Sequence, residues 1–194
     1  SDGTPAGTVF PTGTLPVAFY TIEGLVTTQT MAYAVATVQQ NPTTRVLVRS
    51  DGATYTLLFQ SNEYTCAPAG VEIARVGPRV YFTGDSGGCQ LMVYDGASVS
   101  RIGVQPDLAS TLGPRNLTPF AGALYYSVEG DRRLYRVTGT DASSVTTMAV
   151  LGRSGAVPMS TFVATSQSLY LVAGAPATDR ELYRFDGASL TMVE

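Results

Sequence analysis

The stretches CQLMVYDGASVSRIG (residues 89–103) and RELYRFDGASLTMVE (residues 180–194) share one pattern. Each begins with a short apolar segment, passes through Asp-Gly-Ala-Ser and ends in a second apolar segment. Asp-Gly is a strong hairpin signal, because Gly readily adopts the positive φ that a tight turn between antiparallel strands requires and Asp tolerates it. We therefore predict that each stretch is a β-hairpin with a type I′ turn at Asp-Gly.

Two further stretches align with these, RVLVRSDGATYTLLF (45–59) and RRLYRVTGTDASSVTTM (132–148). In the second of them Thr138 replaces the turn Asp, and the additional residues that follow predict a longer loop. Another Asp-Gly stands at Asp2, so the turn positions fall at 2, 51, 95, 138 and 186, in steps of 43–49 residues. Self-similarity at a period of this size is typical of repeat architectures.

Two strand-like segments precede each of the four hairpins. Segments with a central aromatic residue lie at 30–38, 79–85, 123–130 and 168–175, and before them lie segments at 16–24, 70–77, 117–122 and 160–166. Four short strands in each repeat are the content of a β-propeller blade, which is a four-stranded antiparallel sheet. We predict an all-β propeller-type domain over 1–194, with blades at 14–60, 61–105, 106–151 and 152–194. Residues 1–13 are then the outer strand of a preceding blade.

This incomplete first blade leaves two interpretations open. The chain is a fragment of a longer protein, with further blades supplied by the same or another chain, or a four-bladed ring closes and leaves the first strand as an extra edge. An unpaired edge exposes backbone donors and acceptors and invites association.

The composition excludes several classes of function. The chain has 194 residues, no Lys, scattered Arg and a net charge of −3, so it lacks the clustered positive charge of a nucleic-acid binder. No apolar run approaches the roughly 20 residues that span a bilayer, which predicts no membrane span. His is absent, which excludes Ser-His and Cys-His pairs and an ordinary zinc site.

Arg49, Arg136 and Arg184 each stand two residues before a predicted turn. A row of guanidinium groups at one repeat position suits an acidic glycan or a carboxylate-bearing partner. In the alternative interpretation, each Arg packs its stem across the neighbouring blade and pairs with a local Asp.

Acidic residues gather in the predicted loops between the second and third strands, among them Asp85, Glu129 and Asp131. Clustered oxygen ligands suit calcium, although none of these segments resembles an EF-hand, and solvated turn acids are the alternative. We predict no cofactor other than such a calcium ion. To act as glycosidase carboxylates, two of these acids would have to lie about 5 Å or about 6.5–9.5 Å apart.

Three smaller features each allow two interpretations. Cys66 and Cys89 are either a disulfide or two ordinary thiols. The strand tyrosines serve either packing between blades or stacking on sugars. Asn116 begins an Asn-Leu-Thr glycosylation triplet, which a Thr-rich chain also contains by chance.

The opening SDGTPAGTV (1–9) and the hairpin RELYRFDGA (180–188) resemble the two halves of the ELWxxDGT repeat, which is found in large bacterial surface or secreted proteins. The resemblance is closest at 1–9, 79–96 and 169–189, whereas Tyr135 and Tyr183 stand where that family has Trp. It implies a β-propeller-like array at the cell surface or outside a bacterium, with the periplasm as the alternative.

We therefore expect a non-enzymatic interaction or scaffold module. It would bind a protein or a polysaccharide, or assemble as part of a larger surface protein. The alternative is a carbohydrate-active enzyme, a hydrolase or lyase, in which carboxylates from different blades meet at the central funnel.

Overall fold

The structure is a computed structural model, which describes residues 19–38, 44–61, 72–85, 89–102, 113–128, 131–150, 159–175 and 179–193. The chain forms two compact units, Ser1–Tyr64 and Thr65–Glu194. The regular structure of the described residues consists of β-strands and one 3-10 turn, η1 (Ala142–Ser144). The all-β prediction is confirmed, while the predicted leading strand at 1–13 lies outside the described residues.

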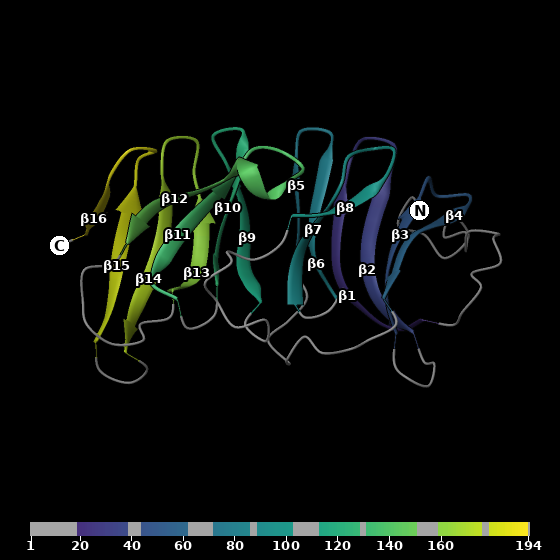
Figure 1. Ribbon diagram of the computed structural model, residues 1–194, viewed down its shortest axis with the longest axis horizontal. Helices are drawn as coiled ribbons and strands as arrows, with labels where there is room; N and C mark the ends of the chain where they lie inside the picture. Colours follow the sequence, from purple (N-terminus) through teal and green to yellow (C-terminus); the bar gives the residue numbers. More distant parts are fainter. Residues whose placement is uncertain are drawn as a thin grey trace, which may run out of the picture. The chain divides into compact units, whose positions relative to one another are not determined.

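The first unit contains one four-stranded sheet, sheet A, in which each strand pairs antiparallel with the next (Figure 1). Its strands are β1 (Phe19–Thr27), β2 (Ala32–Val38), β3 (Thr44–Ser50) and β4 (Tyr55–Ser61). β-Branched and small apolar residues of the two central strands form its core, namely Ala36, Val38, Val46 and Val48. Such residues pack well on a pleated surface.

The second unit contains three more sheets with the same topology, which stand side by side in Figure 1. Sheet B consists of β5 (Ile73–Val76), β6 (Arg79–Asp85), β7 (Cys89–Tyr94) and β8 (Val99–Arg101). Sheet C consists of β9 (Pro114–Phe120), β10 (Ala123–Val128), β11 (Arg133–Val137) and β12 (Val145–Val150). Sheet D consists of β13 (Met159–Ala164), β14 (Leu169–Ala175), β15 (Asp179–Phe185) and β16 (Leu190–Met192).

All four sheets pair their strands in the same register. A tyrosine on the second strand lies opposite an Arg or Val on the third, which lies opposite a Thr or Ser on the fourth. These sets are Tyr33–Arg49–Thr56, Tyr81–Val93–Ser100, Tyr125–Arg136–Thr146 and Tyr170–Arg184–Thr191. The repeat in the sequence is therefore also a repeat of strand register.

The predicted type I′ turn at Asp-Gly is wrong. In sheet B the loop holds four residues, closed by the Asp95 N–H donating to the Ser98 carbonyl at 3.2 Å. The backbone N–H groups of Ala97 and Ser98 both donate to the Asp95 carboxylate at 2.8 Å, and only Gly96 has a positive φ, of 106°. The Asp side chain thus supplies an acceptor that mimics a backbone turn and selects a longer loop.

The same arrangement recurs in the other hairpins. The Asp51 carboxylate accepts from the N–H groups two and three residues on, and so does that of Asp186. The loop after β11 is longer, as predicted, and Asp141 takes over this role by capping η1. A two-residue turn with two positive φ values does occur, at Ala121 and Gly122 between β9 and β10.

The three sheets of the second unit pack face to face. One core joins sheets B and C, with residues such as Tyr81 and Leu91 against Tyr126 and Tyr135. A second core joins sheets C and D and consists of Phe120, Ala123, Tyr125, Leu134, Met159, Leu169, Leu171, Ala173 and Phe185. Both faces of sheet C are therefore buried, which is why its central strands are apolar on both sides.

Candidate functional site

The three predicted arginines lie on separate sheets. Arg49 is in the first unit, on β3, and is half-buried. In the second unit Arg136 lies opposite Tyr125, on the face of sheet C that packs on sheet D. Arg184 lies next to the buried Phe185 of sheet D, and because neighbouring strand residues point to opposite faces, its side chain lies on the far face of that sheet. Sheet D thus separates the guanidinium groups of Arg136 and Arg184.

Neither of these two arginines pairs with an Asp among the described residues. The Nε of Arg136 is buried and finds no hydrogen-bond partner in the described part of the chain. Burial raises the pKa of Tyr125, and the nearby positive charge of Arg136 opposes that shift. Arg184 is exposed, and its Nε donates to the Ser168 hydroxyl at 2.8 Å.

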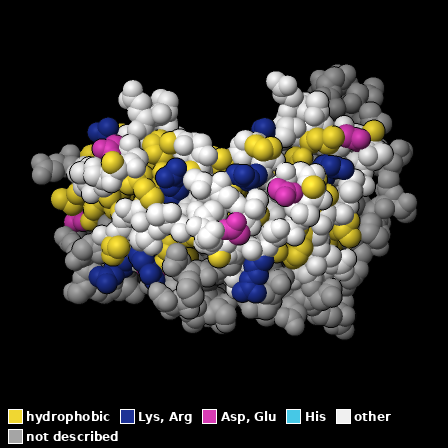
Figure 2. Space-filling model, turned by 45° about the horizontal axis from the view of Figure 1, so that its top comes forward, with side chains coloured by type: hydrophobic (Ala, Val, Ile, Leu, Met, Phe, Trp, Pro, Cys, Tyr) yellow, Lys and Arg dark blue, Asp and Glu magenta, His cyan; other side chains and the backbone are white. Residues whose placement is uncertain are grey.

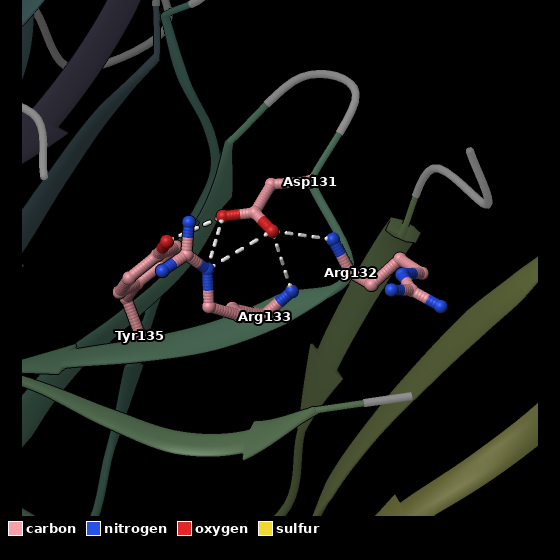
Figure 3. Close-up of polar contacts among 4 residues, drawn as sticks. All are labelled: Asp131, Arg132, Arg133 and Tyr135. Atoms are coloured by element: carbon pink, nitrogen blue, oxygen red, sulfur yellow. Dashed lines mark hydrogen bonds and ion pairs between the residues drawn. The ribbon is translucent and has the colours of Figure 1, made fainter. Parts of the chain in front are cut away.

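Asp131 is buried at the start of β11, where it organises a local network (Figure 3). Its carboxylate accepts hydrogen bonds from the backbone N–H of Arg132 at 2.7 Å, from the Arg133 Nε at 2.9 Å and from the Tyr135 hydroxyl. The Arg132 guanidinium points away from the carboxylate. Burial, followed by the bond to Asp131, raises the pKa of Tyr135. Because both of its oxygens accept hydrogen bonds, this carboxylate holds the first residues of β11 in place.

Of the other two predicted acids, Asp85 ends β6, where its backbone pairs with that of Cys89. The Asp85 side chain and Glu129 lie outside the described residues. The described part of the chain contains no group of three or more His, Cys, Asp or Glu side chains arranged to hold a metal ion.

Cys89 is disulfide-bonded and buried. The other cysteine of the chain, Cys66, lies outside the described residues. A Cβ atom at Gly113 would stand 2.3 Å from the Cys89 Sγ, so a side chain at residue 113 would force the disulfide or the backbone to shift.

Glu72 was not predicted. It stands just before β5, and its Oε2 accepts the backbone N–H of Leu117 on β9 at 2.5 Å, which links the first strands of sheets B and C. Burial raises the pKa of this carboxyl, while its hydrogen bonds and the Arg115 charge oppose the shift. No local sequence pattern marks Glu72, because the N–H group that it binds lies 45 residues along the chain.

Asn116 forms the matching link from sheet C to sheet D. It lies at a bulge in β9 with a φ of 58°, and its Nδ2 donates to the Ser127 hydroxyl at 2.9 Å and to the Met159 carbonyl at 3.1 Å. The Asn side chain of the Asn-Leu-Thr triplet is thus hydrogen-bonded inside the fold.

The first unit holds an ion pair between a buried Arg and a half-buried Glu, which was also not predicted. The Arg45 Nε lies 3.1 Å from the Glu23 Oε2, and the Thr37 hydroxyl donates to the other oxygen of the same carboxylate. Glu23 lies at a bulge in β1, so the bulge turns a charged side chain toward the inside of the unit.

The loops that close the hairpins of the second unit form a further surface, at the upper ends of the sheets in Figure 1. We call it the hairpin rim and define it as residues 95–98, 138–144 and 186–189. It is tied across sheets, because the Arg79 Nη1 donates to the Thr138 carbonyl at 2.6 Å and the Tyr81 hydroxyl donates to the Gly139 carbonyl at 3.1 Å. Each loop also carries its own carboxylate acceptor.

No protein-family model matches the sequence, and no curated protein does. A solved chain from a structural and mechanistic study of two prolyl endopeptidases matches with a TM-score of 0.55 at 15% sequence identity. The match covers 84% of this chain and 24% of that chain. That neighbour contains a propeller, and likeness at this identity concerns the fold alone. The four four-stranded antiparallel sheets are accordingly β-propeller-type blades.

The described residues include no helix long and apolar enough to cross a membrane.

Proposed function

We propose that this chain is a non-enzymatic interaction module of an extracellular or surface-exposed bacterial protein. It presents rigid loops to a protein or polysaccharide ligand and forms part of a larger assembly of blades. The extracellular setting and the kinship with ELWxxDGT-repeat proteins belong to this proposal and rest on the sequence resemblance.

The observation that carries the proposal is the set of hydrogen bonds that closes the loops of the hairpin rim and ties the middle loop to the neighbouring sheet. Each loop there is closed on its own Asp carboxylate, and the contacts from Arg79 and Tyr81 fix the middle loop to the neighbouring sheet. A preorganised surface loses little conformational entropy when a ligand binds. The exposed loop residues are small or polar, a composition suited to hydrogen bonding with a sugar or a peptide.

The alternative is a carbohydrate-active enzyme, and one observation favours it. Glu72 is a largely buried carboxyl with a raised pKa, as a general acid requires. Its oxygen is occupied by the Leu117 N–H, however, and among the described residues no second carboxylate is placed beside it. These contacts favour a structural role for Glu72.

The two functions separate in one experiment. The chain is passed over an acidic polysaccharide such as polygalacturonate and a neutral one such as xylan, and both retention and new chain ends are measured. We expect retention without cleavage on at least one of them. Replacing the exposed loop residues, as Ala97→Trp and Ala188→Trp, should weaken retention, because the larger side chains cover the rim but leave the backbone N–H groups in place. Thr147→Trp, on the outer strand β12, is the matched control.

Two results would overturn the proposal. The release of new chain ends that disappears in Glu72→Gln would establish the enzyme. Retention that is equally strong in the rim variants and in Thr147→Trp would remove the rim as the binding surface.

A further inference from the structure

Three hairpin loops of this protein place an Asp directly before a Gly, at Asp51, Asp95 and Asp186. All three aspartates are exposed, and the glycines that follow them have positive φ values of 90°, 106° and 102°. Apart from the chain neighbours, no atom of the described residues lies within 4 Å of the position that a Cβ on any of these glycines would take. Figure 2 shows acidic side chains at the surface where the upper ends of the sheets come forward. The carboxyl groups and the backbone nitrogens that follow them thus have room to react.

An Asp-Gly pair can rearrange with water as its only other reactant. The Gly nitrogen attacks Cγ of the neutral carboxyl, the new C–N bond closes a succinimide ring, and the carboxyl hydroxyl leaves with the N–H proton as water. Water then opens the ring. Opening at Cγ restores Asp, whereas opening at the main-chain carbonyl yields isoaspartate, in which the chain runs through the side chain. Gly favours the attack, because no side chain crowds its nitrogen or restricts its backbone.

The three pairs differ in how the attacking nitrogen is held. The Gly52 N–H donates to the Ser50 hydroxyl at 3.1 Å. In the part of the chain that the structure describes, the N–H groups of Gly96 and Gly187 have no acceptor. Since the attack requires the peptide to turn its nitrogen toward Cγ, the bond to Ser50 must first break in the first of these loops.

We propose that Asp95 and Asp186 are sites of spontaneous isomerisation to isoaspartate, and that the Ser50 hydroxyl protects Asp51 from the same reaction. The inference goes beyond the proposed function and does not rest on it. Isomerisation adds a methylene group to the main chain of the turn and moves the carboxylate away from the two N–H groups that it accepts in its own loop. The modified loops therefore lose the hydrogen bonds that close them.

Asp141 is an internal reference for this reaction. Its carboxylate accepts the N–H groups two and three residues on at 2.9 Å and 3.2 Å, as in the Asp-Gly loops, but the next residue is Ala142. The methyl group of Ala crowds the attacking nitrogen, so isoaspartate should form there much more slowly. The difference between Asp141 and Asp95 thus separates the effect of the Gly from that of the carboxylate hydrogen bonds.

The test follows isoaspartate in the intact, folded chain during incubation at mildly acidic pH, where part of the carboxyl groups is neutral. After reduction of the disulfide, tryptic cleavage at Arg places the four aspartates in four different peptides, and isoaspartyl peptides elute apart from aspartyl peptides of equal mass. Isoaspartate should accumulate several-fold faster at Asp95 and Asp186 than at Asp51, and slowest at Asp141. In Ser50→Ala the rate at Asp51 should rise toward that at Asp95. Unchanged rates at Asp95 and Asp186 show that the variant is folded.

A second measurement does not depend on the variant. In concentrated guanidinium chloride the turns no longer form, so the three Asp-Gly pairs of the wild type should react at similar rates. Four results would overturn the proposal. They are rates at Asp95 and Asp186 no higher than at Asp141, an Asp51 rate in the folded wild type equal to that at Asp95, an Asp51 rate that Ser50→Ala leaves unchanged, and the same difference between Asp51 and Asp95 in the unfolded chain.

Discussion

Several carboxylates of this protein accept hydrogen bonds from backbone N–H groups. The burial of each carboxylate decides whether its pKa is raised or lowered. The turn residues Asp51, Asp95 and Asp186 are exposed, and two backbone N–H groups lower the pKa of each below its ordinary value of 3.8. Glu72 makes the same kind of bond, yet burial raises the pKa of its carboxyl above the ordinary 4.5. The charged form is favoured at the turns and disfavoured at Glu72.

The turn carboxylates predict a loss of stability in acid. A lowered native pKa contributes stability that is complete above 3.8 and is lost as the pH falls through the native pKa. The urea concentration at half-unfolding should therefore fall when the pH is lowered through this window. In Asp95→Asn/Asp186→Asn the fall should be shallower, because Asn keeps a carbonyl acceptor and carries no charge to titrate. Equal falls in the variant and the wild type would contradict this account.

For Glu72 we predict the opposite dependence of stability on pH. A raised native pKa means that the unfolded chain ionises first, so this carboxyl lowers stability as the pH rises above 4.5. Glu72→Gln should be at least as stable as the wild type at pH 7, because the amide oxygen can still accept the Leu117 N–H. Glu72→Ala leaves that N–H without its acceptor and should cost about 1–3 kcal/mol in chemical unfolding. Equal losses in both variants would show that the hydrogen bond is unimportant.

We predict that residue 113 must be glycine only because the Cys89 sulfur lies beside it. A methyl group at residue 113 would clash with the Cys89 Sγ and Cβ, which lie 2.3 Å and 3.0 Å from the Cβ position. Gly113→Ala should lower the melting temperature of the oxidised protein. In a Cys89→Ala background, where the sulfur atom is gone, the same substitution should lower it much less. A loss that is the same in both backgrounds would point to the backbone instead of the disulfide.

At the scale of the element, single carboxylates bind side chains from the strands around them. The buried Asp131, just before β11, receives the Tyr135 hydroxyl and the Arg133 guanidinium, and the half-buried Glu23 at the bulge of β1 binds Thr37 and Arg45 of the next two strands. Removal of one partner from a buried charged network leaves a charge without its full set of bonds, which is costly.

Tyr135→Phe is therefore expected to destabilise the protein by about 1.5–3 kcal/mol, the usual range for a hydrogen bond to a charged group. Tyr183→Phe is the matched control, since Tyr183 occupies the same repeat position in sheet D and its hydroxyl donates to the Glu181 carboxylate at 2.7 Å. The Tyr183 residue is only half-buried, so water can replace this bond and the loss should be smaller. Denaturant unfolding measures both, and equal losses would contradict the role of burial.

The sequence predicts elements well here and predicts contacts poorly. The hairpins were visible because Asp-Gly and the apolar segments recur at a constant period. The turn type was missed because the Asp95 side chain competes for the N–H groups of its own turn. Glu72 and Asn116 were missed because their partners, Leu117 and Met159, lie 45 and 43 residues along the chain, where no local pattern reports them.

At the scale of the whole molecule, the repeat explains how sheet C buries apolar side chains on both of its faces. Each blade of the second unit is too small to bury its own apolar surface, so neighbouring blades supply the cover. Tyr125 illustrates this, because its ring lies 5.6 Å from that of Phe185 on the next sheet. The same logic leaves the far face of sheet D exposed.

The most direct test of this stacking is the double-mutant cycle between Tyr125 and Phe185, measured by chemical unfolding with Leu at either or both positions. The account predicts a coupling free energy of about 0.5–1.5 kcal/mol for this aromatic pair across sheets C and D. A cycle between Phe185 and Tyr170, which occupies the same repeat position as Tyr125 but lies on the far face of sheet D, should give a value near zero. A coupling near zero for Tyr125 and Phe185, or equal values in the two cycles, would contradict the stacking of consecutive sheets.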